Sequence, residues 1–363
     1  MSMLVPVPGP DSAEPPSVLP AAEPPSVPPA AEPPSVPPSP EPRRSHRKRY
    51  ALLAVLLLLL LCSAYLWTTY LFTHQPITQT LPVAQVAAQA IKPHYLFSIY
   101  GVDEPVGIAV APDGSKIYVG ESGGQRLIKV FDKDGKPLAS FTAPGAQSGS
   151  SAPVSLSLDN QGRVFVADSM RHVIDIYDAG GNFKKSIQPP FKQVWAPVGV
   201  DVEGKTVFVA GRNSQAEGIF AMTLDGQLLF QLGHHGEDAS ADGFYQPDKA
   251  VQDGQGRIYV SDSMNQRLAV FDRNHKFLYS LPGFNLPRGM AVGDDQKLYV
   301  VDTIDQMVKV LDVGGTTAKS LFSFGDWGIG DGQFNYPNDI ALDNAGRLYI
   351  SDRASNRVQV WTY

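Results

Sequence analysis

Six short apolar strands, each centred on an aromatic residue, recur along the C-terminal part of the chain. They read KIYVGE, RVFVAD, TVFVAG, RIYVSD, KLYVVD and RLYISD. Successive aromatic residues stand 40 to 51 positions apart, and they are Tyr118, Phe165, Phe208, Tyr259, Tyr299 and Tyr349. A repeat of this period indicates a propeller or a solenoid rather than a single compact domain.

Each aromatic strand sits within the same order of elements. A proline and a short apolar strand precede it, as in PVGIAV at residues 105–110. A polar loop, a third strand such as LAVFD, a turn and a fourth strand such as FLYSL follow it. No helical period is present, and strands that are apolar along their length suit sheets covered on both faces. Because radial stacking covers both faces of every sheet, the pattern predicts an all-β, six-bladed β-propeller of four-stranded blades.

The last blade lacks a fourth strand, because the sequence ends at Tyr363 directly after its third one. A spare fourth-strand motif, YLFSIYG at residues 95–101, precedes the first blade and resembles SLFSFG at residues 320–325. We therefore expect residues 95–101 to pair with residues 357–363 and to complete a propeller domain over residues 94–363. This pairing closes the ring without a disulfide and removes the open sheet edges.

The N-terminal segment has a different composition. Residues 1–42 carry AEPPSV motifs repeated every nine positions, and proline at this density blocks helices and sheets and favours polyproline II. We expect a disordered, Pro-rich tail, with docking to a proline-binding domain as the alternative. A basic juxtamembrane cluster, RRSHRKR, follows within residues 43–50.

Residues 51–73 form an apolar segment without formal charge. A helix of this length crosses a hydrocarbon core of roughly 30 Å, which predicts a single transmembrane helix acting as a signal anchor. A cleaved signal peptide is the alternative, but the apolar stretch is long and the segment before it is very long for such a peptide. The basic cluster keeps the tail in the cytoplasm, so we expect a stalk over residues 74–93 and the propeller outside the cell membrane.

Charge and cysteine content narrow the choice of partners. The protein has 363 residues and a formal net charge of −6, and the five acidic and five basic residues among the first 50 positions cancel. The negative excess therefore lies after residue 50, and an acidic domain repels phosphate backbones, so nucleic acid is not an expected partner. Cys62 is the single cysteine, which excludes an intramolecular disulfide and a multi-thiolate metal site.

The segment from Phe324 to Trp361, FGDWGIGDGQFNYPNDIALDNAGRLYISDRASNRVQVW, resembles an NHL repeat. The shared pattern is a Gly-rich loop, a Phe, a Pro, an apolar strand, an Asp-x-x-Gly turn, an aromatic strand and an Asp-Ser-x-Asn-x-Arg loop, and the resemblance covers residues 95–363. It implies a six-bladed propeller. Related propellers are platforms for protein or RNA, lactonases or amidating lyases, so the resemblance leaves the function open.

The polar loop after each aromatic strand carries an acidic residue in five blades and an Arg five positions later in three. Residues repeated around a ring cannot mark one catalytic centre. Side chains of these types accept backbone N–H bonds in tight turns, and Arg can bind carbonyls or the acid itself. We therefore predict a structural role for Glu121, Asp168, Asp262, Asp302, Asp352, Arg126, Arg267 and Arg357.

Function is expected where the blades differ. The two residues after each inner-strand proline approach the central axis; they are small and apolar in blades one to three and mostly charged or polar in blades four to six. The long loops GHHGEDASADGFYQP and GDWGIGDGQFNYP add aromatic and polar groups. The predicted ligand-binding face consists of Asp248, Lys249, Arg288, Asn338, Asp339, Trp327, Tyr245, His234 and His235. The alternative is that the charged members merely pair with one another.

An enzymatic function would require a metal site of the kind found in related propellers. Lactonase-like propellers hold a divalent ion at the axis with Glu, Asn and Asp, but blade one offers only Val106 and Gly107 at the inner strand. Lyase-like propellers need several His ligands, whereas those on this face stand in outer loops. We therefore expect no catalytic residue, metal or cofactor, and a platform for a protein, peptide or surface polymer. A metal-dependent hydrolase or lyase, or a purely structural component, is the alternative.

Overall fold

The computed structural model divides into two compact units, Met1–Leu81 and Pro82–Tyr363. The residues that it describes are 55–61, 63–64, 92–146, 149–188, 195–212, 217–236 and 242–363. In the first unit, residues 55–61 and 63–64 are helical. No helix within the described ranges combines the length and apolar character needed to span a membrane. The predicted tail and basic cluster, and most of the predicted membrane span and stalk, lie outside these ranges.

The described part of the second unit contains six antiparallel sheets of four strands each, the blades. Blades one to three comprise β2 (Pro105–Val110), β3 (Ile117–Glu121), β4 (Ile128–Phe131), β5 (Pro137–Phe141); β6 (Pro153–Leu158), β7 (Val164–Asp168), β8 (Val173–Tyr177), β9 (Phe183–Ile187); and β10 (Ala196–Glu203), β11 (Thr206–Arg212), β12 (Glu217–Thr223), β13 (Leu228–Leu232).

Blades four to six comprise β16 (Pro247–Gln252), β17 (Ile258–Asp262), β18 (Arg267–Phe271), β19 (Phe277–Leu281); β20 (Pro287–Val292), β21 (Lys297–Asp302), β22 (Met307–Asp312), β23 (Lys319–Phe324); and β24 (Pro337–Leu342), β25 (Arg347–Asp352), β26 (Arg357–Thr362), β1 (His94–Ile99). A parallel pair, β14 (His234–His235) and β15 (Gly243–Phe244), lies between blades three and four in the sequence. A short 3₁₀ helix, η2 (Arg353–Ser355), links β25 and β26.

The first strand of every blade faces the axis, and these strands contact one another in sequence around the ring, with β2 meeting β24 at the junction. Among the described residues, six hydrophobic clusters fill the spaces between neighbouring blades. The six repeated aromatic residues are all buried, with at most 2% of their surface exposed. The prediction of a six-bladed, four-stranded propeller is therefore confirmed.

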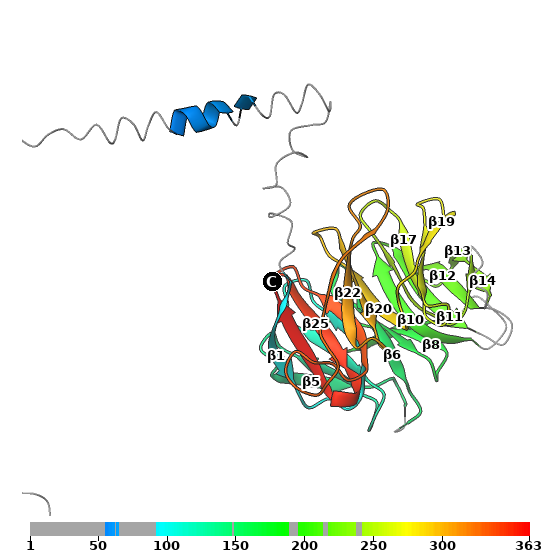
Figure 1. Cartoon of the computed structure of the whole chain (residues 1–363). Coiled ribbons are helices and arrows are strands. Elements are labelled where there is room, and N and C mark those ends of the chain that lie inside the picture. The colour runs from blue at the N-terminus through cyan, green and yellow to red at the C-terminus, as the bar shows by residue number, and fades with distance from the viewer. Residues whose placement is uncertain are drawn as a thin grey trace, which may run out of the picture. The chain divides into compact units, whose positions relative to one another are not determined.

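The ring closes where its two ends meet. Strand β1 pairs antiparallel with β26, and the register sets Tyr95 opposite Trp361 and Ile99 opposite Val358. In Figure 1 β1 lies beside the C-terminal strands. Ile99 is buried between blades six and one with Val358, so the closure buries apolar surface as well as satisfying backbone groups. These strands fall in the two segments for which the sequence predicts pairing.

A bulge follows the proline that opens each inner strand. In blade four, Pro247 pairs with Asp262 but Lys249 pairs with Ser261, which leaves Asp248 as the extra residue. The same one-residue shift follows Pro105, Pro153 and Pro197, and it also follows Pro287 and Pro337, where the stretch without pairing is longer. A bulge takes a residue out of the ladder and redirects its side chain. These residues therefore become the lining of the axial opening.

Candidate binding site at the mouth of the propeller

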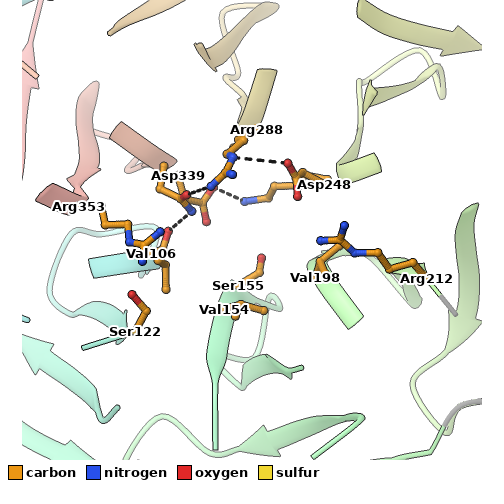
Figure 2. Close-up of a pocket in the computed structure, with 13 residues that line it drawn as sticks. Val106, Ser122, Val154, Ser155, Val198, Arg212, Asp248, Arg288, Asp339 and Arg353 are labelled. Atoms are coloured by element: carbon orange, nitrogen blue, oxygen red, sulfur yellow. Dashed lines mark hydrogen bonds and ion pairs between the residues drawn. The ribbon is translucent and has the colours of Figure 1, made fainter. Parts of the chain in front are cut away.

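A cavity of about 290 Å³ lies at one end of the axis, which we call the mouth. The residue directly after the proline of every inner strand lines it, and these residues are Val106, Val154, Val198, Asp248, Arg288 and Asn338. In Figure 2 Arg288, Asp339 and Asp248 from blades four to six lie opposite Val154 and Val198, and Arg212 of blade three lies on the side of Val198. The residues directly after the prolines thus form the expected apolar and charged halves, but Arg212 of blade three adds a cation to the apolar half.

Lys249 and Asp339 form a buried ion pair at the floor of the mouth. The Lys249 Nζ lies 2.8 Å from Asp339 Oδ1, and both side chains are more than 90% buried. Asp339 Oδ2 also accepts the Ile108 N–H, which ties blade six to blade one. Burial raises the pKa of the Asp339 carboxyl, and the positive charge of Lys249 opposes this rise. These two predicted binding residues thus satisfy each other, while Asp248 and Arg288 stand above them.

Arg288 spans the boundary between blades five and six. One of its terminal NH groups donates to Asn338 Oδ1 at 2.6 Å, and its guanidinium lies 5.8 Å from the centre of the Tyr336 ring. Its Nε lies 3.7 Å from Asp248 Oδ2, which is an ion pair but too long for a hydrogen bond. Within the described residues this buried Nε–H has no hydrogen-bond acceptor. The guanidinium is therefore held in place while most of its five N–H donors have no acceptor among the described residues.

Two further arginines reach the mouth from the ends of second strands or the loop beyond. Arg353 donates to Glu104 Oε2 at 2.8 Å, and this bond is the main reason that the pKa of Glu104 is lowered. Arg212, the last residue of β11, has no ion-pair or hydrogen-bond partner within the described ranges, and no dashed line reaches it in Figure 2. Glu217 lies opposite Arg212 in the ladder but accepts the Gln246 N–H at 2.6 Å.

The repeated carboxylates lie in the blade framework, away from the axis. Asp262 accepts the Tyr245 N–H at 2.8 Å and the Arg267 Nε–H at 2.8 Å, and Asp352 receives the equivalent bonds from Asn335 and Arg357. Desolvation by burial raises the pKa of Asp262 despite these bonds. Asp168 and Asp302 likewise accept backbone N–H groups from the segment that precedes the inner strand. Each such carboxylate fastens a loop to its own blade.

Blade one departs from the predicted pairing. The cation beside Glu121 is Lys129, whose Nζ lies 2.9 Å from Glu121 Oε1. Arg126 instead donates to the Ser122 carbonyl and, more weakly, to Ser151 O in the loop before blade two. The expectation that Arg126 binds carbonyls is met, but the acid of this blade takes its cation from the third strand because Lys129 projects from β4.

The aromatic and histidine residues predicted for the binding face are dispersed. His234 lies 3.7 Å from Asp242, and His235 lies 3.6 Å from Glu217 and makes an edge contact with the Tyr245 ring. The backbone of Trp327 forms an isolated parallel β-bridge with Phe334, and 71% of the surface of Trp327 is exposed. None of these four residues lines the mouth cavity. The described ranges contain no group of three or more His, Cys, Asp or Glu side chains placed to hold a metal ion.

A second cavity, of about 250 Å³, continues the axis below the Lys249–Asp339 pair. Its wall is mostly backbone and apolar side chains of the inner strands, with Asp201 and Glu203 from β10 as its acids. Asp201 accepts a hydrogen bond from Ser157 Oγ at 3.2 Å. Burial raises the pKa of Asp201 to about 6, and Lys249 partly opposes the effect. The axis therefore carries a titratable acid that sequence reasoning does not identify.

Three residues of the axial cavities are not predicted from the sequence, namely Arg212, Arg353 and Asp201, and only the two arginines leave a signal in it. Arg212 and Arg353 occupy the position at which other blades carry Ser122, Ser263 or Thr303. That departure from the repeat is a sequence signal, and it is strongest in blade three, where Gly211 also replaces the acid. Asp201 carries no comparable signal, because an alternating inner strand gives no indication that one of its polar residues lines a cavity on the axis.

Comparison with known proteins agrees with this architecture. Residues 334–361 match the NHL repeat family. NHL repeat-containing protein 3 of Homo sapiens is 32% identical over 78 residues, which is 22% of this chain and 22% of that protein. The Mus musculus protein of the same name is 26% identical over 175 residues, covering 45% of this chain and 50% of that one. The matches thus span at most half the length of these relatives.

Solved structures of low sequence identity share the fold. A streptogramin B lyase structure has a TM-score of 0.55 and 15% identity, covering 74% of this chain and 98% of that one. A nidogen/laminin complex has a TM-score of 0.51 and 15% identity, covering 64% of this chain and 93% of that one. At this identity the likeness concerns the fold alone. The protein is similar to NHL repeat-containing proteins and is itself a six-bladed β-propeller with an NHL repeat in its last blade.

Proposed function

We propose that this protein is a membrane-anchored binding platform whose propeller, outside the cell membrane, takes a protein, peptide or surface polymer at its mouth. The observation that carries the binding role is the construction of the mouth. Six bulged residues line an open cavity, and its polar residues differ from blade to blade while the framework around them repeats. Propellers commonly use such an axial face for recognition.

The arrangement of Arg288 supports recognition rather than mere packing. Its two neighbours, Asn338 and Asp248, hold the guanidinium at the cavity wall, and Tyr336 lies beside it. Arginine beside an aromatic ring, at the edge of an apolar surface, is a common feature of binding hot spots. The three valines across the mouth supply that apolar surface. A ligand that enters the mouth therefore meets both a fixed cation and an apolar wall.

The proposed membrane anchor is inferred from the sequence. The uncharged segment over residues 51–73, with the basic cluster before it and none directly after it, is typical of a single-pass anchor that leaves the C-terminal domain outside. Alkaline carbonate extraction of membranes from cells that express the full-length protein should leave it in the pellet. Protease added to intact cells should degrade the propeller. Release of the protein by carbonate, or full protection from protease, would contradict this topology.

The binding role is tested with a charge-reversal variant. The tagged full-length protein is crosslinked in intact cells, and co-purified components are quantified for wild type, Arg288→Glu and Arg273→Glu. Arg273 is exposed in the turn between β18 and β19, at the opposite end of the blade from the mouth, so it matches the charge change without touching the cavity. We expect a component that Arg288→Glu loses and Arg273→Glu retains. The same set of components for all three proteins would refute the site.

A further inference from the structure

The charges around the mouth do not balance. Four cations line the cavity: Arg212, Lys249, Arg288 and Arg353. Three carboxylates face them, because Asp339 pairs with Lys249, Glu104 pairs with Arg353, and Asp248 lies 3.7 Å from Arg288. One positive charge therefore remains. Within the described ranges it belongs to Arg212, which has no partner at all.

The strand that carries Arg212 offers it no internal acceptor. The cross-strand residue Glu217 is the nearest acid in the ladder, but it makes no ion pair with Arg212 within the described residues; its Oε2 accepts the Gln246 N–H and lies 3.6 Å from His235 Nδ1. Arginine is not needed here for the blade, because other blades use a small hydroxyl at this position. Ser263 and Thr303 each bind the carbonyl of the next blade's proline. In blade three this hydrogen bond between blades is therefore replaced by the guanidinium of Arg212, which offers N–H donors to the cavity.

Arg288 is a second cationic side chain in the same cavity that has N–H donors without acceptors in the part of the chain that the structure describes. Its buried Nε–H lacks an acceptor among the described residues, although its other contacts fix the guanidinium. This Nε–H faces Asp248 Oδ2 at 3.7 Å and is closed to solvent, but 28% of the Arg288 side chain is exposed, so the outer N–H groups of the guanidinium can meet a ligand. One guanidinium without a counter-ion and one guanidinium that is held in place and partly exposed therefore line a single cavity of about 290 Å³.

We propose that the mouth binds a single carboxylate presented by a polypeptide, either on an acidic side group or at a free C-terminus. This inference rests on the binding role proposed above and names the chemistry of the ligand. One carboxylate balances the one excess positive charge, and it can accept two parallel N–H bonds from Arg212 and a further bond from Arg288. A phosphate of charge near −2 would exceed that balance beside the buried Asp339.

The size and rim of the mouth favour a polypeptide over an acidic polymer. The cavity is at the lower end of the range for small-molecule sites, which begins at roughly 300 Å³, so it suits one side chain or a peptide terminus. Two exposed apolar side chains stand near its lining residues: the Tyr336 ring, 37% exposed, lies beside the Arg288 guanidinium, and Met264, 46% exposed, follows Ser263, whose hydroxyl binds Asp248. Apolar side chains flanking a carboxylate occur in peptides, whereas acidic polysaccharides carry repeated charges and little apolar surface.

The test uses fluorescent heptapeptide pools of mixed Leu, Phe and Val, measured by fluorescence anisotropy with the purified full-length protein in detergent. One pool has a free C-terminal carboxylate; a second has a C-terminal amide and one internal Glu; a third has the amide and Gln instead. We expect the first or second pool to bind and the third to bind at least about tenfold more weakly, and the stronger of the first two identifies the source of the carboxylate. Equal binding of all three pools, or no binding of any pool, would overturn the proposal.

The variants assign the carboxylate to Arg212. Arg212→Ser restores the hydroxyl of the other blades and should weaken binding about tenfold or more, whereas Arg212→Lys should lose less because it keeps the charge. Arg273→Ser is the matched control, and thermal unfolding checks that every variant is folded. Unchanged binding by Arg212→Ser overturns the proposal. So does preferential binding of a phosphoserine pool or of oligogalacturonate, and in either case the crosslinking result for Arg288→Glu still decides the binding role by itself.

Discussion

Asp201 offers a direct measurement of the electrostatics along the axis. Its side chain lines the lower cavity, where burial raises its pKa from the ordinary 3.8 to about 6. Lys249 favours the ionised form, whereas Glu203 and Asp339 disfavour it. The folded protein therefore binds a proton at Asp201 more tightly than the unfolded one does, and the substitution Asp201→Asn removes this titration while nearly keeping the shape of the protonated acid.

The raised pKa of Asp201 sets the direction in which stability changes with pH. Below the ordinary pKa of 3.8 the carboxyl is protonated in both the folded and unfolded states, so ionisation costs the fold nothing. As the pH rises towards about 6, the unfolded state ionises freely but the folded state resists, and wild type loses stability. A pKa difference of about two corresponds to about 3 kcal/mol, which is fully expressed above the folded-state pKa. The variant avoids this loss.

The measurement is urea unfolding of the full-length protein in detergent, followed by tryptophan fluorescence from about pH 3 to about pH 8, a range that brackets the titration. The stability difference, Asp201→Asn minus wild type, should rise by about 3 kcal/mol across this range. Asp225→Asn is the control, because the ion pair with Lys185 lowers the pKa of the exposed Asp225 and removes any reason for such a rise. A difference for Asp201→Asn that is flat or falls with pH would refute the assignment of a raised pKa.

Two further substitutions test the packing around the axis. Lys249→Met leaves Asp339 buried without its cation and should lower the free energy of unfolding, measured with urea, by about 3–5 kcal/mol. The double variant Lys249→Met, Asp339→Leu should recover much of this loss, because it removes the unpaired acid as well. Equal stability of the single and double variants would contradict the pairing. Gly199→Ala should destabilise by about 1–3 kcal/mol, because the added Cβ would lie 1.9 Å from the Asp248 carbonyl oxygen, whereas Gly254→Ala, whose Cβ meets nothing within 4 Å, should melt at nearly the wild-type temperature.

The fold could be predicted because its rules are local and repeated. Each aromatic strand supplies a ring that is buried between neighbouring blades, as Phe165 and Tyr259 show. The same residue type must therefore return once per blade, and the spacing of the returns counts the blades. The spare strand before blade one is equally informative, because a radial ring leaves one unfilled edge unless its first and last strands pair.

The cation partners of the repeated acids could not all be predicted, because strand pairing decides them. In blade four the partner of Asp262 is Arg267, directly across the hairpin, and the motif spacing reveals it. In blade five Asp302 binds Lys309 instead, a residue two positions farther along β22. Both kinds of side chain reach the same carboxylate position, so a missing Arg in the motif does not mean a missing ion pair.

The two residues after each proline look equivalent in the sequence, and the bulge separates them. Asp248 is the extra residue and stands at the cavity wall, while Lys249 returns to the ladder opposite Ser261 and reaches Asp339 at the floor. One is available to a ligand and the other is consumed by the framework. Sequence alone could not divide them, because both are charged and adjacent, and only the register tells which one leaves the ladder.

Arg212 and Arg353 show why a departure from a repeat predicts a site without predicting its chemistry. Both stand where other blades have a small residue with a hydroxyl group, so the sequence gives no reason to distinguish them. Glu104, contributed by the loop before blade one, neutralises Arg353, and the pairing lowers the pKa of Glu104. The corresponding acid near Arg212, Glu217, makes no ion pair with it in the described part of the chain, and its Oε2 accepts the Gln246 N–H instead. The charge available to a ligand is therefore set by what surrounds each arginine in the ring, and blade three is where the mouth keeps a cation for a ligand.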